Sequence, residues 1–80
     1  MLTRFISAAM SHAEYEILEN GTYYGEIPGC DGVLANASNL EACRQLLQEV
    51  LEEWIILGLR LGHTLPEIDG IRLGVTGEAA

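Results

Sequence analysis

The sequence has 80 residues, enough for one small domain with a modest hydrophobic core. Twelve acidic side chains oppose four arginines and no lysine, which gives a formal net charge of −8. This charge repels nucleic-acid phosphate and anionic lipid, so we expect no direct nucleic-acid binding, no membrane binding and attraction to basic proteins.

The first predicted element is a short amphipathic helix within residues 1–13. Its apolar side chains recur at the spacing of one helical face, and they are Leu2, Phe5, Ile6, Ala9, Met10 and Ala13. We expect this face to pack against the rest of the domain.

A three-stranded antiparallel meander is predicted for residues 14–36. Its first turn is Asn20-Gly21, a pair that favours the two positive-φ positions of a type I′ hairpin turn. Its second turn is the segment 28–32, rich in glycine, where Pro28 ends a strand because proline cannot donate to the ladder.

A long helix is predicted for residues 38–61 and a last strand for residues 70–75. Ser38 and Glu41 have the spacing of a capping box, and Gly62 is placed to end the helix in a left-handed conformation. One helix covering one face of the sheet gives a two-layer α+β domain, with the order β-β-β-α-β after the N-terminal helix. We expect the whole chain, 1–80, to be a single domain.

The second half of the long helix is apolar almost all round. One arc is expected to face the sheet, and it comprises Leu40, Cys43, Leu46, Leu47, Val50, Leu51, Trp54, Leu57, Gly58 and Leu61. Ile55, Ile56 and Leu59 instead fall on the side of the helix that carries the polar residues. Either they form a homo-oligomer interface, or the N-terminal helix or the loop after the long helix covers them. We favour the interface, because a domain of this size gains stability from a partner.

No catalytic, metal or cofactor site is predicted, and we do not expect an enzyme. Glu14 and Glu16 project from one strand face with Glu26 on the next strand, which raises the possibility of a metal-dependent hydrolase. The helix carboxylates that would complete such a site point away from the sheet. Cys30 and Cys43 lack the spacing of a zinc site or a disulfide framework, so we expect reduced thiols in a cytoplasmic protein.

Two motifs resemble the HicB-like antitoxin family. The first is the aromatic strand and proline step at residues 23–28, YYGEIP, followed by Gly-Val at 32–33. The second is the helix start at residues 38–42, SNLEA, with a Gly-to-Pro helix ending at 62–66. Order and spacing agree with the family over about residues 14–75.

The resemblance implies a partly degenerate ribonuclease-H-like fold without ribonuclease activity, which assembles as a homodimer or homotetramer. It also implies an antitoxin that binds and neutralises a small, basic, RNA-cleaving toxin of the HicA type. The sequence departs from the family at Asp31, where a second proline is usual. Members often add a C-terminal DNA-binding segment, for which a sequence ending at Ala80 leaves no room, so operator binding is not expected.

Glu26 and Asp31 are the predicted toxin contacts, because they are acidic and lie on or beside the exposed sheet. The alternative function is an orphan oligomeric domain that binds a small ligand or a metal between subunits.

Overall fold

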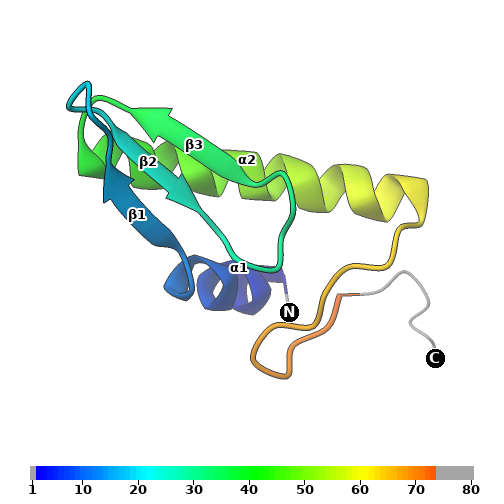
Figure 1. The fold of residues 1–80 in the computed structure, drawn as a ribbon. Coiled ribbons are helices and arrows are strands. Elements are labelled where there is room, and N and C mark those ends of the chain that lie inside the picture. The colour runs from blue at the N-terminus through cyan, green and yellow to red at the C-terminus, as the bar shows by residue number, and fades with distance from the viewer. Residues whose placement is uncertain (1, 74–80) are drawn as a thin grey trace.

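The computed structural model describes residues 2–73, which form a small antiparallel sheet with one long helix packed on one face and a short helix that contacts the long one (Figure 1). The elements in chain order are α1 (Leu2–Ser11), β1 (Glu14–Ile17), β2 (Tyr23–Glu26), β3 (Leu34–Ala37) and α2 (Leu40–Leu61). The predicted N-terminal helix, meander and long helix are therefore confirmed. The domain is α+β.

The sheet has the strand order β1-β2-β3, and both neighbouring pairs are antiparallel. In its middle row Tyr15 pairs with Gly25, and Gly25 pairs with Ala35. Gly25 and Ala35 are buried beneath α2, which packs mainly on β3 and β2. Because side chains alternate along a strand, the neighbouring positions point to the other face, away from the helices.

Gly25 leaves room for an aromatic ring in the middle of the sheet. A Cβ atom at this position would lie 2.8 Å from Cδ1 of Tyr15 and 3.3 Å from Sγ of Cys43. We expect Gly25→Ala to lower the free energy of unfolding by about 1–3 kcal/mol, because the Tyr15 ring must move out of a packed position. Urea unfolding measures the loss.

The control for this prediction is the same substitution in a Tyr15→Leu background. There the ring is gone, so the added methyl group should cost much less. Equal costs in the two backgrounds would contradict the proposed contact.

The first hairpin forms as predicted, but its turn is of a different type. Only Gly21 has a positive φ, of 85°, while Leu18 exchanges hydrogen bonds with Gly21 and Thr22 across the loop. This is the geometry of a turn followed by a left-handed glycine bulge. Asn20 does not enter the left-handed region; its side-chain Oδ1 instead accepts hydrogen bonds from the amide and hydroxyl of Thr22.

The long helix begins one residue later than a Ser38 cap requires. Asn39 is the N-cap, and its Oδ1 accepts a hydrogen bond of 2.8 Å from the amide of Ala42. The Glu41 carboxylate accepts a hydrogen bond from the Arg44 guanidinium, and it does not form the second bond of the predicted capping box. At the other end Gly62, with φ of 74°, closes the helix as predicted. Within residues 2–73 no helix is long and apolar enough to cross a membrane.

The core lies between the sheet, α2 and α1. Its buried side chains are Phe5, Ala9, Ile27, Cys30, Val33, Ala35, Cys43, Leu47, Leu51 and Ile55. On α2 the buried residues follow the i, i+4 row, which turns by about 40° around the axis every four residues. Because the buried row turns in this way, Ile55 is buried. Leu46, Leu57 and Leu61 are more exposed than expected for one arc that faces the sheet along the whole helix.

The predicted fourth strand is wrong in the part of the chain that the structure describes. Residues 70–73 form no ladder with the sheet, and positions 74 and 75 lie outside the described residues. Asp69 and Gly70 have positive φ angles of 51° and 77°, and they turn the chain back so that Ile68 and Ile71 bond to each other. The observed order is therefore α-β-β-β-α, not one ending in a strand.

Two buried thiols and a partly buried phenol make the stability of the fold sensitive to alkaline pH. Burial raises the pKa of the Cys30 and Cys43 thiols above their ordinary 9.0, and burial also raises the pKa of Tyr15 above 10.0. A pKa that is raised in the folded state means that its contribution to stability is complete below the unfolded-state pKa and is lost as pH rises from there through the folded-state pKa. We therefore expect the urea midpoint to fall progressively above about pH 9. A midpoint that stays constant up to about pH 11 would contradict this.

Candidate functional site

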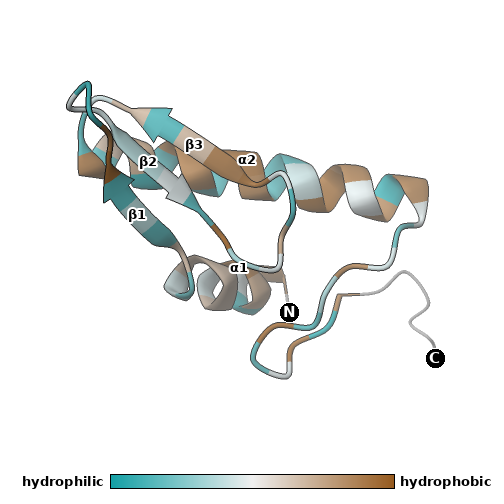
Figure 2. Ribbon diagram, in the orientation of Figure 1, coloured by the Kyte–Doolittle hydropathy of each residue, from teal (hydrophilic) through white to brown (hydrophobic). Residues whose placement is uncertain are grey.

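One face of the sheet is left uncovered by the helices. We call it the open sheet face, and it consists of Glu14, Glu16, Tyr24, Glu26, Leu34 and Asn36. Its two cross-strand rows are Glu14–Glu26–Leu34 and Glu16–Tyr24–Asn36, and five of the six side chains are exposed while Tyr24 is half-buried. Figure 2 colours most of β1 as hydrophilic, which reflects the two glutamates of this strand.

The open sheet face carries negative charge without a matching cation. Glu14 and Glu26 are directly opposite each other on β1 and β2, a like-charge pair that destabilises a sheet. The ion pairs found within residues 2–73 involve none of its three glutamates. The free protein therefore keeps an unfavourable electrostatic interaction that a basic partner would relieve.

An aromatic hydroxyl is held among these carboxylates. Tyr24 donates a hydrogen bond of 3.0 Å from its hydroxyl to Oε1 of Glu26. This bond, followed by partial desolvation and the negative charges of Glu26 and Glu16, raises the pKa of Tyr24 above its usual value of 10.0. Beside it, the Asn36 amide donates to the Thr22 hydroxyl and to the Tyr23 carbonyl oxygen. The face thus presents oriented polar groups around a half-buried ring.

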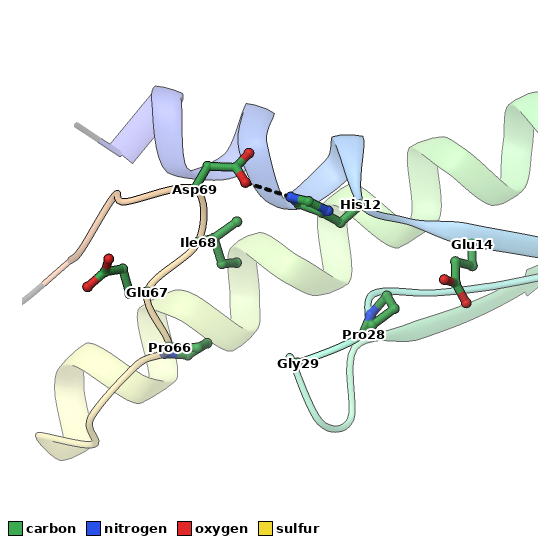
Figure 3. A pocket seen from close by; sticks show the side chains of 8 residues that line it. All are labelled: His12, Glu14, Pro28, Gly29, Pro66, Glu67, Ile68 and Asp69. Carbon is green, nitrogen blue, oxygen red and sulfur yellow. Dashed lines mark hydrogen bonds and ion pairs between the residues drawn. The ribbon is translucent and has the colours of Figure 1, made fainter.

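A cleft of about 410 Å³ adjoins the open sheet face (Figure 3). One wall is the start of β1 with the turn at Pro28-Gly29, and the other is the segment 66–69. Glu14 belongs to the cleft as well as to the open sheet face, so the two acidic surfaces are continuous.

The far wall of the cleft is tied to α1 by one polar contact. His12 Nε2 lies 2.8 Å from Oδ1 of Asp69, and both side chains are about half exposed. Figure 3 shows this contact, with Ile68 next to it on the same segment, and Pro28 and Glu14 on the other side of the cleft. Among residues 2–73 no three His, Cys, Asp or Glu side chains gather in a metal-binding group. The strand glutamates and the α2 carboxylates indeed lie on different sides of the sheet.

Comparison with protein families decides where this chain belongs. A family model described as UPF0150-like matches residues 4–66, which include most of α1, the whole sheet and α2. The chain belongs to the UPF0150-like family. A solved structure described as the crystal structure of TTHA0281 from Thermus thermophilus is 39% identical, with a TM-score of 0.87. The match covers 92% of this chain and 93% of that one. Comparison with curated proteins found no match.

The two toxin contacts predicted for this UPF0150-like protein lie in different local settings. Glu26 ends β2 on the open sheet face, whereas Asp31 is exposed in the turn between β2 and β3. From the sequence, Glu14 and Glu16 suggest only a possible metal site, although their alternation with Tyr15 places them on one strand face. The antiparallel register then puts them beside Glu26.

The three residues predicted to form an oligomer interface do not form a common surface. Ile55 is buried in the core, with 1% exposure, and Leu59 packs partly against the core. Leu65 covers this side of α2, since a Cβ atom on Gly58 would lie 2.8 Å from Cδ2 of Leu65. Only Ile56 is exposed, among polar side chains. Placing Ile55 outside the core was wrong, because the buried row drifts toward it.

Proposed function

We propose that this UPF0150-like protein is an antitoxin of the HicB type, which binds and neutralises a small, basic, RNA-cleaving toxin of the HicA type. The observation that carries the proposal is the open sheet face, which holds three glutamates and no cation among the described residues. This face would attract a positively charged protein surface and so speed association. In the complex, its charges would favour a basic partner over other proteins.

The family membership supports the same proposal. The motifs that resemble HicB-like antitoxins span about residues 14–75, and the UPF0150-like match spans residues 4–66. The resemblance and the match therefore concern the same sheet and long helix. We propose that the protein acts by binding, without catalysis.

We also propose that the protein works in the cytoplasm, where an RNA-cleaving toxin meets its substrate. Cys30 and Cys43 are both buried thiols that are not joined in a disulfide. Unpaired thiols of this kind persist in a reducing compartment.

Co-expression with a small basic HicA-type toxin tests the proposal. We expect the two proteins to purify as one complex, and we expect growth to recover relative to cells that express the toxin alone. Toxicity that is undiminished by a folded, well-expressed protein would refute the antitoxin function.

A further inference from the structure

The outer edge of β1 is open along the side of the sheet. β1 comes first in the strand order β1-β2-β3, and among the helices and strands within residues 2–73 its backbone lies next to that of β2 alone (Figure 1). The long helix α2 packs on β3 and β2 instead. An edge strand of this kind presents backbone amide and carbonyl groups to any chain that approaches in an extended conformation.

The first hairpin shows which backbone groups of β1 face this edge. Leu18, next to β1, exchanges both of its backbone hydrogen bonds with the returning half of the hairpin. Hydrogen bonding alternates along an antiparallel strand, so Glu16 and Glu14 also bond toward β2. Tyr15 and Ile17 therefore direct their amide and carbonyl groups outward.

The pairing of β2 with β3 leads to the same assignment. The amide of Ile27 donates to the carbonyl of Val33, so the odd-numbered residues of β2 bond toward β3 and the even-numbered ones bond toward β1. These even-numbered residues, Tyr24 and Glu26, are paired with the even-numbered residues of β1. The odd-numbered residues of β1 thus carry the free backbone groups, and no backbone group from the described turns and loops bonds to them.

The two sides of β1 present different surfaces to an added strand. Glu14 and Glu16 lie on the open sheet face, exposed and without an ion pair in the described part of the chain. Ile17 points to the other side and is 65% exposed, because α2 does not extend beneath β1. Neighbouring strands place their side chains in register on each face, so the best-fitting segment alternates basic and apolar side chains.

Charge selects both the partner and the edge. Two β1 strands related by a two-fold axis would pair with Glu16 directly opposite Glu16 of the second copy, and like charges in that position destabilise a sheet. A second copy of this chain is therefore disfavoured here, and a basic segment is favoured. The other outer strand, β3 (Leu34–Ala37), has no charged side chain with which to attract it.

We propose that the basic partner adds an extended segment to the outer edge of β1 as an additional strand, with basic side chains beside Glu14 and Glu16 and apolar side chains beside Ile17. The identity of this partner as a HicA-type toxin rests on the proposed function. The added strand would continue the open sheet face by one row, so main-chain bonds would fix the register while the carboxylates select the partner.

Amide hydrogen exchange of the isotope-labelled full chain, alone and saturated with the HicA-type toxin, tests the proposal. The amides of Tyr15 and Ile17 should exchange rapidly in the free protein and about 100-fold or more slowly in the complex. The amides of Leu34 and Asn36 are the matched control, because the same alternation directs them outward from β3. Their exchange should change little when the toxin binds.

A substitution at Ile17 tests the role of the main chain separately. Ile17→Pro removes an outward amide without removing a bond to β2, and proline is tolerated on edge strands. It should weaken toxin binding by about tenfold or more, whereas Ile17→Val, which keeps the amide, should bind within about twofold of the wild type. If Ile17→Pro proves poorly folded, the exchange measurement on the wild type decides.

The possible outcomes separate this inference from the antitoxin function. Toxin binding that leaves the Tyr15 and Ile17 amides unprotected would overturn the strand addition and leave the antitoxin function standing. Protection of Leu34 and Asn36 alone would place the added strand on the wrong edge and would overturn the inference as well. A folded protein that does not bind the toxin at all would overturn the antitoxin function and, with it, this mode of docking.

Discussion

Replacing Glu14 and Glu26 with glutamine is expected to weaken binding of the basic toxin while it stabilises the free protein. The two carboxylates face each other across β1 and β2, and no cation pairs with them among the described residues. Neutral glutamines remove this repulsion, so the free energy of unfolding should rise by about 0.2–1 kcal/mol. The same change removes two charges from the docking surface, and the dissociation constant should rise at least about tenfold.

The opposite signs of these two effects make the prediction specific. Glu41→Gln/Glu52→Gln is the matched control, because it changes the net charge by the same amount on α2, on the other side of the sheet. We expect this control to bind the toxin nearly as well as the wild type. Calorimetric titration and urea unfolding measure the two quantities. Equal weakening by both variants would show that only the net charge matters and would argue against docking at the open sheet face.

Leu51→Ala is expected to cause a large loss of stability in the chain. Leu51 is fully buried between the sheet and the long helix, and truncation leaves a cavity that the surrounding side chains cannot fill. The expected loss is about 2–5 kcal/mol. Small domains have a total stability of about 5–15 kcal/mol, so the variant should be partly unfolded at elevated temperature.

Ile56→Ala serves as the control for Leu51→Ala. The side chain is of similar size and lies five positions further along the same helix, but it is 55% exposed. Its truncation should change stability by less than about 0.5 kcal/mol. Comparable losses for the two variants in thermal unfolding would mean that the face of α2 that points to the core has been assigned incorrectly.

Local sequence signals were sufficient to predict most of the fold. The spacing of Phe5 and Ala9 indicated the first helix, Pro28 marked the end of a strand, and Gly62 marked the end of α2. These residues act through backbone geometry within a few positions, so their effect is largely independent of tertiary context.

The errors in the fold arose at two turns, where neighbouring residues can form more than one local hydrogen-bonding arrangement. The pair Asn20-Gly21 was expected to adopt two positive φ angles, but the Asn20 side chain bonds to Thr22 and the bulge uses Gly21 alone. Two consecutive positive φ angles occur instead at Asp69-Gly70, where the chain turns back so that Ile68 pairs with Ile71. A strand was therefore predicted where the chain makes a tight turn.

The candidate site was only partly predictable, because it depends on how separate strands pair. The alternation of Glu14 and Glu16 placed them on one face of a strand, but the pairing register was needed to bring them beside Glu26. On α2, the sequence pattern did not show which edge of the broad apolar arc faces the sheet, and the buried row runs toward Ile55 and away from Leu57.

The most direct test of the proposed function is an NMR titration of the isotope-labelled protein with the HicA-type toxin. If the toxin docks on the open sheet face, the largest chemical-shift changes should fall there, at Glu16, Tyr24 and Asn36, while the polar face of α2 around Gln45 and Glu52 is unaffected. Shift changes confined to α2, with the open sheet face unperturbed, would contradict it.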